Sequence, residues 1–203
     1  MDARMHTIGT VEESQRSRRH RLLSFARESI RVALATGDNL VFETDDDWFL
    51  RPAAVFVTLR APSGHEATHG ELRGCIGQVE AERPLYLAVQ DAAIKAATVD
   101  PRFYPVQLGE LDTLCIEVSI LSPMRPIRRL GEIRIGRDGL LISGSGRRGL
   151  LLPEVPLAFD WDRAEFVRHL CLKAGLPEDA WPEHARLQAF TTEAFEDCPA
   201  VAA

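Results

Sequence analysis

The chain has no long hydrophobic run and no basic excess, and each absence removes a class of function. No apolar run approaches the roughly 18 residues that a membrane-spanning helix needs. Residues 1–4 carry no apolar region of the signal-peptide kind. A net charge of −6 and a pI near 5.5 argue against a nucleic-acid-binding protein, which usually has a basic surface. We therefore expect a cytoplasmic protein that binds neither membranes nor nucleic acid.

Paired cysteine motifs are also missing, although the chain has four cysteines. They are Cys75, Cys115, Cys171 and Cys198. Without a Cys-x-x-Cys pair, this spacing favours free thiols in a reducing compartment over a disulfide framework or a zinc site. We expect Cys171 in the core, Cys198 in a tail without a role, and no metal or cofactor.

The pattern of apolar residues predicts helices and strands that do not alternate regularly. Polar residues 1–16 are expected to be disordered, and apolar spacings of three and four predict a helix over residues 17–36. Pro84 opens a second helix that ends at residues 100–102, and Asp162 with Glu165 opens a third. Strands are expected at residues 54–60, 71–79, 113–121, 132–135, 139–143, 149–152 and 185–192. This order favours an α+β fold in which flanking helices cover an antiparallel sheet.

The segment Leu-Arg-Gly-Cys-Ile-Gly at residues 72–77 is the most informative feature of the chain. Gly74 and Gly77 put no side chains beside Cys75, and the neighbouring Arg73 is a cation of the kind that stabilises a thiolate. Cys75 is therefore a candidate nucleophile or redox thiol. The alternative is a small buried residue between glycines that pack beneath a helix. A cysteine nucleophile usually needs a histidine base, and none is near in sequence.

Two further residues are candidates for the same site. Glu117 lies on the less apolar side of its strand with Cys115, and it becomes a candidate acid or base if that side meets the Cys75 strand. A surface glutamate is the alternative. The Arg102 fork is suited to an anionic ligand, or to an ion pair with Glu117 or Asp100.

Two motif-like segments have weaker functional readings. His65-Glu66-x-x-His69 matches a zinc-hydrolase pattern that requires a helix. Here proline and glycine surround it in a hairpin loop over residues 61–70, so we interpret the match as accidental. Arg147 and Arg148 follow a glycine-rich turn that lacks the Gly-Lys-Ser/Thr ending of a phosphate-binding loop, which favours a plain hairpin turn.

Several of these segments together resemble the AMMECR family, also called AmmeMemoRadiSam system protein A. The resemblance rests on residues 72–77 (LRGCIG), 100–103 (DPRF), 116–122 (IEVSILS) and 152–155 (LPEV). It runs in the family's order over nearly the whole chain. Gln78 and residues 97–99 depart from the usual pattern, the first where a small hydroxyl residue is usual and the second where an aromatic is usual.

The resemblance implies one domain over residues 17–195, built from two intertwined, unequal lobes with a cleft, and a tail over residues 196–203. It places the LRGCIG segment near that cleft and implies a Memo-like protein and a radical SAM protein as partners, with no settled reaction. Arg73, Gly74, Cys75, Gly77 and Arg102 are carried over as site residues. Two hypotheses follow: a ligand- or partner-binding module, or an enzyme acting on a small molecule through Cys75, Arg73 and Glu117.

Overall fold

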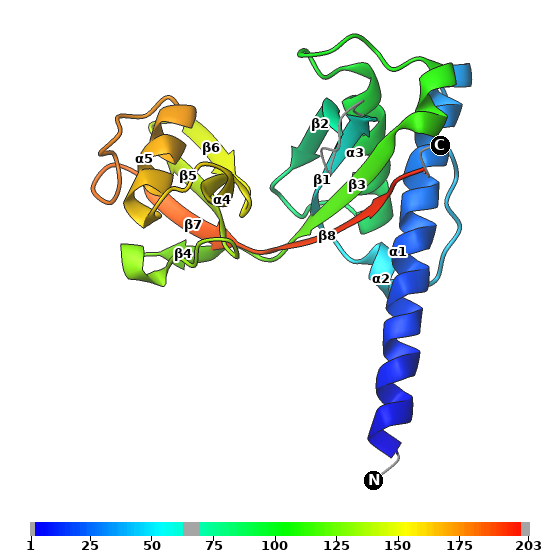
Figure 1. Ribbon diagram of the computed structural model, residues 1–203, viewed down its shortest axis with the longest axis horizontal. Helices are drawn as coiled ribbons and strands as arrows, with labels where there is room; N and C mark the ends of the chain where they lie inside the picture. The colour runs from blue at the N-terminus through cyan, green and yellow to red at the C-terminus, as the bar shows by residue number, and fades with distance from the viewer. Residues whose placement is uncertain (1–2, 63–69, 200–203) are drawn as a thin grey trace. The chain divides into compact units, whose positions relative to one another are not determined.

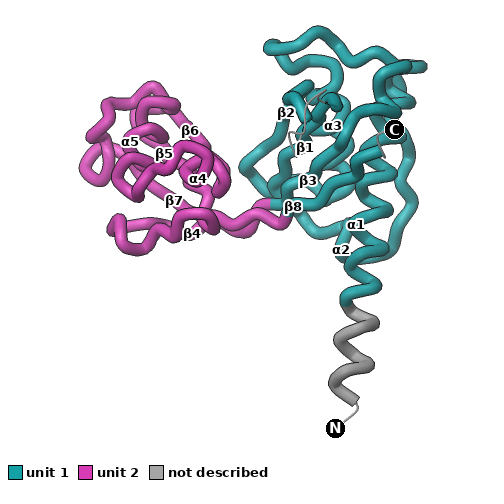
Figure 2. Tube along the Cα trace, in the orientation of Figure 1, with its two compact units in different colours: residues 1–120, 194–203 teal, residues 121–193 magenta. Residues whose placement is uncertain are grey.

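The protein, described from a computed structural model, folds into two compact units (Figures 1 and 2). The structure describes residues 3–62 and 70–199, with side chains from residue 12 onward. Unit 1 comprises residues 1–120 and 194–203, and unit 2 comprises residues 121–193. The chain thus leaves unit 1 to build unit 2 and then returns, and each unit has its own hydrophobic core. No helix among the described residues is long and apolar enough to cross a membrane.

Unit 1 packs helices against one face of a four-stranded sheet. Its elements are α1 (Ala3–Thr36), α2 (Asp47–Leu50), β1 (Ala54–Ala61), β2 (Glu71–Gln78), α3 (Leu85–Thr98), the 3-10 helix η1 (Leu108–Thr113) and β3 (Cys115–Leu121), with β8 (Thr192–Asp197) completing the sheet. The strand order is β2-β1-β3-β8, so β2 is an edge strand. Val55, Val57 and Leu59 of β1 are fully buried and share a core with α1 and α3. Alternation in β1 therefore fixes which sheet face the helices cover.

Unit 2 has the same plan on a smaller scale. It contains β4 (Arg125–Ile127), the 3-10 helix η2 (Leu130–Glu132), β5 (Gly139–Gly144), β6 (Arg147–Leu151), α4 (Val155–Ala158), α5 (Arg163–Lys173) and β7 (Arg186–Phe190). Its antiparallel sheet has the order β4-β7-β5-β6. Helix α5 begins at the expected capping box, in which Asp162 and Glu165 satisfy each other's backbone amides. Its apolar side chains meet the core face of β5 and β7.

The N-terminal boundary was predicted wrongly. Helix α1 begins at Ala3, so residues 3–16, expected to be disordered, continue the helix of residues 17–36. A polar stretch lacks the apolar periodicity that identifies a helix, yet no proline interrupts it.

Two arginines of α1 near residue 16 have defined partners. Arg18 pairs with Asp46, the N-cap of α2, at 2.7 Å, and Arg21 lies over Phe42.

The strand expected at residues 132–135 is also wrong, because that segment leaves η2 for a turn. The buried carboxylate of Asp138 accepts the Arg134 amide at 3.0 Å and an Arg125 guanidinium nitrogen at 2.8 Å. This local network holds the segment in a turn and competes with strand pairing. The short strands β4 and β8 were not predicted, since neither shows a long alternating pattern.

The cysteine prediction needs a correction as well. Cys115 and Cys198 form a disulfide across 83 residues of sequence, with their Cα atoms 4.1 Å apart. The neighbouring strands β3 and β8 bring the two residues together, and sequence spacing carries no information on that pairing. Cys75 and Cys171 are free thiols. Cys171 is fully buried in the core of unit 2 as expected, and burial raises the pKa of its thiol.

Candidate functional site

Cys75 sits on the edge strand β2 with its side chain turned away from the core. It lies opposite Thr58 of β1, and the Thr58 hydroxyl donates a hydrogen bond to the Cys75 sulfur at 3.3 Å. The Cys75 amide points to the outside of the sheet, toward Asp100, so Cys75 and Thr58 form a non-hydrogen-bonded pair. In such pairs the two side chains approach more closely. Cys75 is half-buried and Thr58 is buried.

Asp100 and Arg102 hold the backbone of Cys75 at the open edge of the sheet. Asp100 Oδ2 accepts the Cys75 amide at 2.8 Å, and Arg102 Nη2 donates to the Cys75 carbonyl at 3.2 Å. The two side chains are joined by a fork, with Arg102 Nε and Nη2 at 2.9 and 2.7 Å from the carboxylate. Both outward backbone groups of Cys75 are thus satisfied, which closes part of a strand edge. We call these two residues the Cys75 clamp.

The charges of the clamp stabilise each other. The Arg102 guanidinium holds the pKa of the Asp100 carboxyl well below its usual range, against the opposing effect of burial, and the backbone amides of Cys75 and Arg102 act in the same direction as the guanidinium. Asp100 in turn raises the pKa of Arg102. The Asp100 side chain is only 2% exposed, whereas that of Arg102 is 53% exposed. Of the alternatives for Arg102, the structure therefore has the ion pair with Asp100.

Arg73 contacts groups other than the thiol. Its guanidinium donates to the Tyr104 carbonyl at 2.7 Å, to the Pro105 carbonyl at 3.3 Å and to the Glu110 carboxylate at 2.6 Å. The β1–β2 register shifts at Arg60, so Arg73 is the extra residue of a β-bulge, which redirects a side chain. Arg73 thus ties β2 to the segment that follows the clamp.

The two glycines of the LRGCIG segment permit close packing. A Cβ on Gly74 would collide with the Ala96 carbonyl oxygen of α3. A Cβ on Gly77 would collide with the Val55 carbonyl oxygen and the Phe56 ring of β1. Both glycines are therefore required by neighbouring backbone. Gly74 lies on the helix-covered side and Cys75 on the opposite side.

Glu117 shares that opposite side of the sheet. Ile116, Val118 and Ile120 of β3 are buried in the same core as Val55 and Val57, so the alternate residues Glu117 and Ser119 point the other way, as Thr58 and Cys75 do. The Ser119 hydroxyl donates to Glu117 Oε1 at 3.1 Å. We call Thr58, Cys75, Glu117 and Ser119 the Cys75 face.

Several residues of this site escaped prediction from the sequence. Thr58 and Ser119 stand at alternate positions in apolar strands, a weak signal that places them on the sheet face opposite the helices, where both side chains are buried. Arg60 stands two residues from Thr58, and among the described residues its buried Nε has no hydrogen-bond partner. Such a donor is suited to an added acceptor.

The other groups that could hold a metal are His65 with His69, and one cluster among the described residues. His65 and His69 lie outside the described residues. Cys115, Glu196 and Cys198 bring possible ligand atoms within 4.8 Å of one another, but the two sulfurs are bonded together and offer no thiolate. In unit 2, His169 stacks on Trp161 with ring centroids 3.9 Å apart.

Comparison with known proteins agrees with the resemblance seen in the sequence. The sequence model of the AMMECR1 family matches residues 23–195. Protein MJ0810 of Methanocaldococcus jannaschii is 45% identical over 180 residues, which cover 85% of this chain and 87% of that protein. The crystal structure of the uncharacterized protein PH0010 from Pyrococcus horikoshii is 41% identical, with a TM-score of 0.80, and the match covers 88% of this chain and 91% of that chain. These matches confirm the predicted family resemblance and the α+β fold with antiparallel sheets and flanking helices.

Proposed function

Because the chain belongs to the AMMECR1 family, we propose that it is a binding module whose working surface is the Cys75 face. The surface consists of two hydroxyls, one thiol and one carboxylate on three adjacent strands, β2, β1 and β3. The buried Thr58 and Ser119 hydroxyls orient the sulfur and the carboxylate, so the face offers the partly exposed Cys75 thiol and Glu117 carboxylate on a rigid sheet, and rigid elements position binding groups better than loops do.

The clamp on the Cys75 backbone is the observation that carries this proposal. Asp100 and Arg102 satisfy the backbone of Cys75, Arg73 ties down the following segment, and the glycines admit close packing. Residues of the two segments that carry the family resemblance, 72–77 and 100–103 (the signature segments), therefore fix the position of strand β2. Their charged groups are bound to carboxylates and carbonyls, as expected of a preorganised binding surface.

The proposal also includes two partner proteins. The family resemblance implies a Memo-like protein and a radical SAM protein, and we propose that the Cys75 face contributes to binding one of them in the cytoplasm. If neither protein binds, we propose that the ligand of the Cys75 face is a small molecule. Arg102, Gly74 and Gly77 would then contribute to its binding site. The guanidinium of Arg102, which contacts the Cys75 carbonyl and whose side chain is 53% exposed, is an accessible cation for an anionic group.

Binding of the two purified partners by biolayer interferometry tests the proposal. Glu117→Arg reverses a charge on the face, and Asp38→Arg, at an exposed position after α1, is the matched control. We expect Glu117→Arg to weaken binding at least about tenfold, or about 1.4 kcal/mol, and Asp38→Arg to leave it unchanged. Equal effects of the two variants would contradict the role of the face, and failure of both partners to bind would remove the proposed partners.

An enzyme is the second candidate, and the Thr58 hydroxyl favours it. A donor 3.3 Å from the Cys75 sulfur would stabilise a thiolate, and Glu117 on the same face would serve as acid or base. In this alternative Cys75 is the nucleophile or redox thiol. Arg102 holds an anionic group, and Arg73 acts through the position of the strand because its guanidinium is bound elsewhere.

The rate of Cys75 alkylation by iodoacetamide, measured against pH by mass spectrometry, distinguishes the candidates. Cys171 is buried and Cys198 is disulfide-bonded, so free glutathione is the reference thiol. An activated thiol would be alkylated faster than glutathione at neutral pH, because the thiolate is the reactive form. The binding module predicts slower labelling than glutathione, and retained partner binding in both Cys75→Ser and Cys75→Ala.

A further inference from the structure

Cys115, Glu196 and Cys198 bring three metal-ligand groups together on the sheet of unit 1. One ligand atom of each residue lies within 4.8 Å of those of the other two. Cys115 begins β3, Glu196 belongs to the neighbouring strand β8, and Cys198 directly follows β8. Among the residues that the structure describes, this is the one group of three such ligands. The disulfide joins the two sulfurs, so the group has thiolate ligands only after reduction.

The three side chains lie on the side of the sheet opposite the helices. Leu114 and Ile116, which flank Cys115, are buried in the core that α1 and α3 share, so Cys115 points the other way. Cys198 is bonded to its sulfur, and Glu196 Oε2 lies 3.7 Å from that sulfur. Residues two apart in an extended segment share a side, which agrees with the positions of Glu196 and Cys198. Strand pairing and alternation therefore direct all three ligand groups to one point.

Arg27 of α1 holds both backbone segments from the helix side. Its guanidinium donates to the Leu114 carbonyl at 3.0 Å and to the Asp197 carbonyl at 3.1 Å. These two residues directly precede Cys115 and Cys198. Arg27 also pairs with the Asp197 carboxylate at 2.9 Å, and the arginine side chain is only 12% exposed. None of these contacts involves sulfur, so reduction of the disulfide leaves them intact and the ligand groups stay preorganised for a metal ion.

The distances suit a tetrahedral Zn²⁺ site. With Zn–S bonds of about 2.3 Å and a Zn–O bond of about 2.1 Å, tetrahedral ligand atoms lie about 3.6 to 3.8 Å apart. Glu196 Oε2 is 3.7 Å from the Cys115 sulfur. Reduction breaks the bond between the sulfurs, and rotation of the exposed Cys198 side chain then gives them the same separation. Thiolates favour zinc over magnesium or calcium, zinc also accepts a carboxylate, and three protein ligands leave the fourth position to water.

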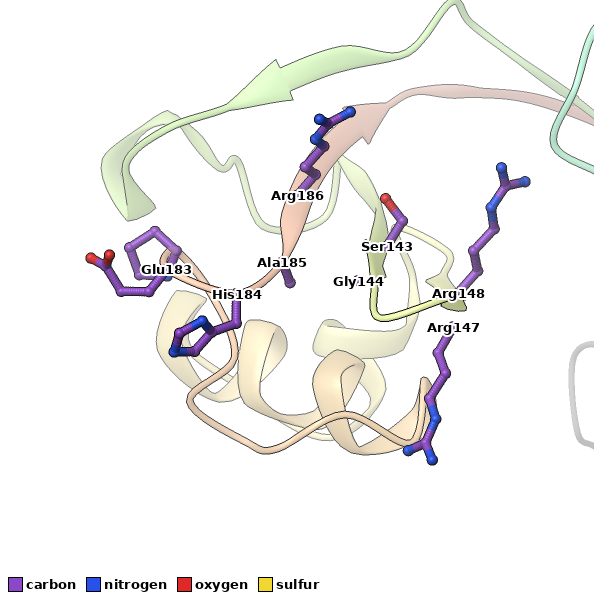
Figure 3. A pocket seen from close by; sticks show the side chains of 10 residues that line it. Ser143, Gly144, Arg147, Arg148, Glu183, His184, Ala185 and Arg186 are labelled. Carbon is purple, nitrogen blue, oxygen red and sulfur yellow. The ribbon is translucent and has the colours of Figure 1, made fainter.

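The arginine-rich hollow of unit 2 is a less suitable place for a metal ion. Figure 3 shows its lining, which includes the possible ligands Glu183 and His184 together with Arg147, Arg148 and Arg186. Three arginines against one glutamate make the hollow positive, and a positive site disfavours a cation. Zinc binding is therefore expected at the cysteine cluster of unit 1.

We propose that Cys115, Cys198 and Glu196 bind one Zn²⁺ ion when the disulfide is reduced, and that oxidation of the two thiols releases the ion. A dithiol reductant supplies two electrons and two protons, which convert the protein disulfide to two thiols while the reductant becomes a cyclic disulfide. Zn²⁺ then displaces both protons to solvent and binds the two thiolates. In reverse, a small disulfide takes two electrons from the thiolates and becomes two thiolates itself, the protein S–S bond forms, and the ion leaves.

The reductant has access to this disulfide. Cys198 is exposed and Cys115 is half-buried, and thiol–disulfide exchange depends on such access. In the cytoplasm proposed above, reductants of this kind keep thiols reduced. Disulfide and zinc each fasten β8, the segment by which the chain returns to unit 1, to β3. The site lies outside the Cys75 face, and its test does not depend on the function proposed for that face.

Zinc titration of the full chain in its oxidised and reduced forms tests the proposal. The oxidised form is the chain in which two thiols titrate after unfolding. The reduced form is prepared with dithiothreitol, freed of it by gel filtration without oxygen, and titrated with Zn²⁺ in competition with a chromophoric chelator. We expect reduction to add one Zn²⁺ per chain. Co²⁺ in place of Zn²⁺ should give a thiolate-to-cobalt charge-transfer band, which reports sulfur ligands.

Three variants of the reduced chain assign the ligands. Cys115→Ser and Cys198→Ser should each weaken zinc binding at least about 100-fold, because each loses a thiolate. Glu196→Gln should weaken it about tenfold. Glu82→Gln, at an exposed glutamate of the same unit, is the matched control and should bind as the parent does. Without zinc, melting temperatures equal to that of the reduced parent would show that the variants remain folded, and zinc should raise the melting temperature of the parent but not of the cysteine variants.

Four results would overturn the proposal. The first is the absence of zinc binding by the reduced chain at micromolar concentration. The second is equal zinc binding by the oxidised and reduced forms, which would place the metal on residues that the disulfide does not join, such as His65 and His69. The third is binding that both serine variants leave unchanged. The last is no greater weakening by Glu196→Gln than by Glu82→Gln, because the metal would then bind a thiol pair without the carboxylate.

Discussion

Replacing Asp100 by asparagine tests the Cys75 clamp most directly. The Asp100 carboxylate accepts four hydrogen bonds. Oδ2 accepts from the Cys75 amide and Arg102 Nη2, and Oδ1 accepts from the Arg102 amide and Nε. Asparagine has the same shape but keeps one oxygen, so in either orientation its NH₂ group faces two donors. The substitution therefore removes two hydrogen bonds and the negative charge without leaving a cavity.

The expected cost follows from the burial of the two partners. Hydrogen bonds to a charged group contribute about 1.5–3 kcal/mol each, and breaking a buried ion pair costs about 3–5 kcal/mol. Arg102 is half-exposed and can turn to water, which lowers the cost, whereas the Asp100 site is 2% exposed. We expect a loss of about 3 kcal/mol at β2. The matched control is Asp112→Asn, which breaks a solvent-exposed pair with Arg31 and should leave the local stability of β2 unchanged.

The dependence on pH gives a second check. The folded pKa of Asp100 is depressed, so its contribution to stability is complete above the unfolded value of about 3.9 and is lost as the pH falls toward the folded value. The gap in stability between parent and variant should therefore narrow by about 1.4 kcal/mol per pH unit below about 3.9. Above pH 5 the gap should be constant.

Hydrogen–deuterium exchange of the peptide that covers β2 measures this local stability. A loss of about 3 kcal/mol corresponds to roughly 100-fold faster exchange of protected amides. Comparing parent and variant at the same pH cancels the intrinsic exchange rate. Exchange in Asp100→Asn no faster than in Asp112→Asn, or a gap that persists at low pH, would refute the reasoning.

Two further predictions concern packing and cysteines. Gly74→Ala should destabilise unit 1 by about 3 kcal/mol in urea unfolding, since its Cβ meets the backbone oxygen of Ala96 and overpacking costs about 1–3 kcal/mol or more. Gly109→Ala, which adds a methyl group to open space, should cost far less, and similar losses in both variants would contradict this account. Thiol titration of the unfolded chain should count two thiols before reduction and four after it, because Cys115 and Cys198 are bonded; four beforehand would exclude the disulfide.

Local patterns in the sequence predicted the elements that have strong local signals. The alternation over residues 113–121 marks β3, and the Asp162–Glu165 capping box marks the start of α5. The misses have no local signal. Polar residues 3–16 extend α1 without an apolar stripe, and β8 is recognisable only by its place beside β3. The Cys115–Cys198 disulfide follows from that same pairing.

The sequence predicted which residues belong to the candidate site but not the contacts that they make. The sequence identifies residues 72–77 and Arg102, and strand alternation places Glu117 opposite the core. It does not show that Arg73 belongs to a bulge, because a bulge is a property of the pairing between two strands. Arg73 is next to Cys75 in sequence, yet its guanidinium binds Glu110 and two backbone carbonyls and does not contact the thiol.

The clamp also links the two signature segments physically. Asp100 and Arg102 touch the backbone of Cys75, 25 and 27 residues earlier in the chain, and Arg73 reaches forward to Glu110. Each segment therefore holds the other in place on the edge of the sheet. Whether the Cys75 face binds a partner or reacts with a ligand, Asp100 acts as a positioning residue. Asp100→Asn should therefore weaken binding or reactivity at the Cys75 face by loosening β2. Arg102→Lys keeps the positive charge but loses the fork, so it should retain only part of the stabilisation of β2.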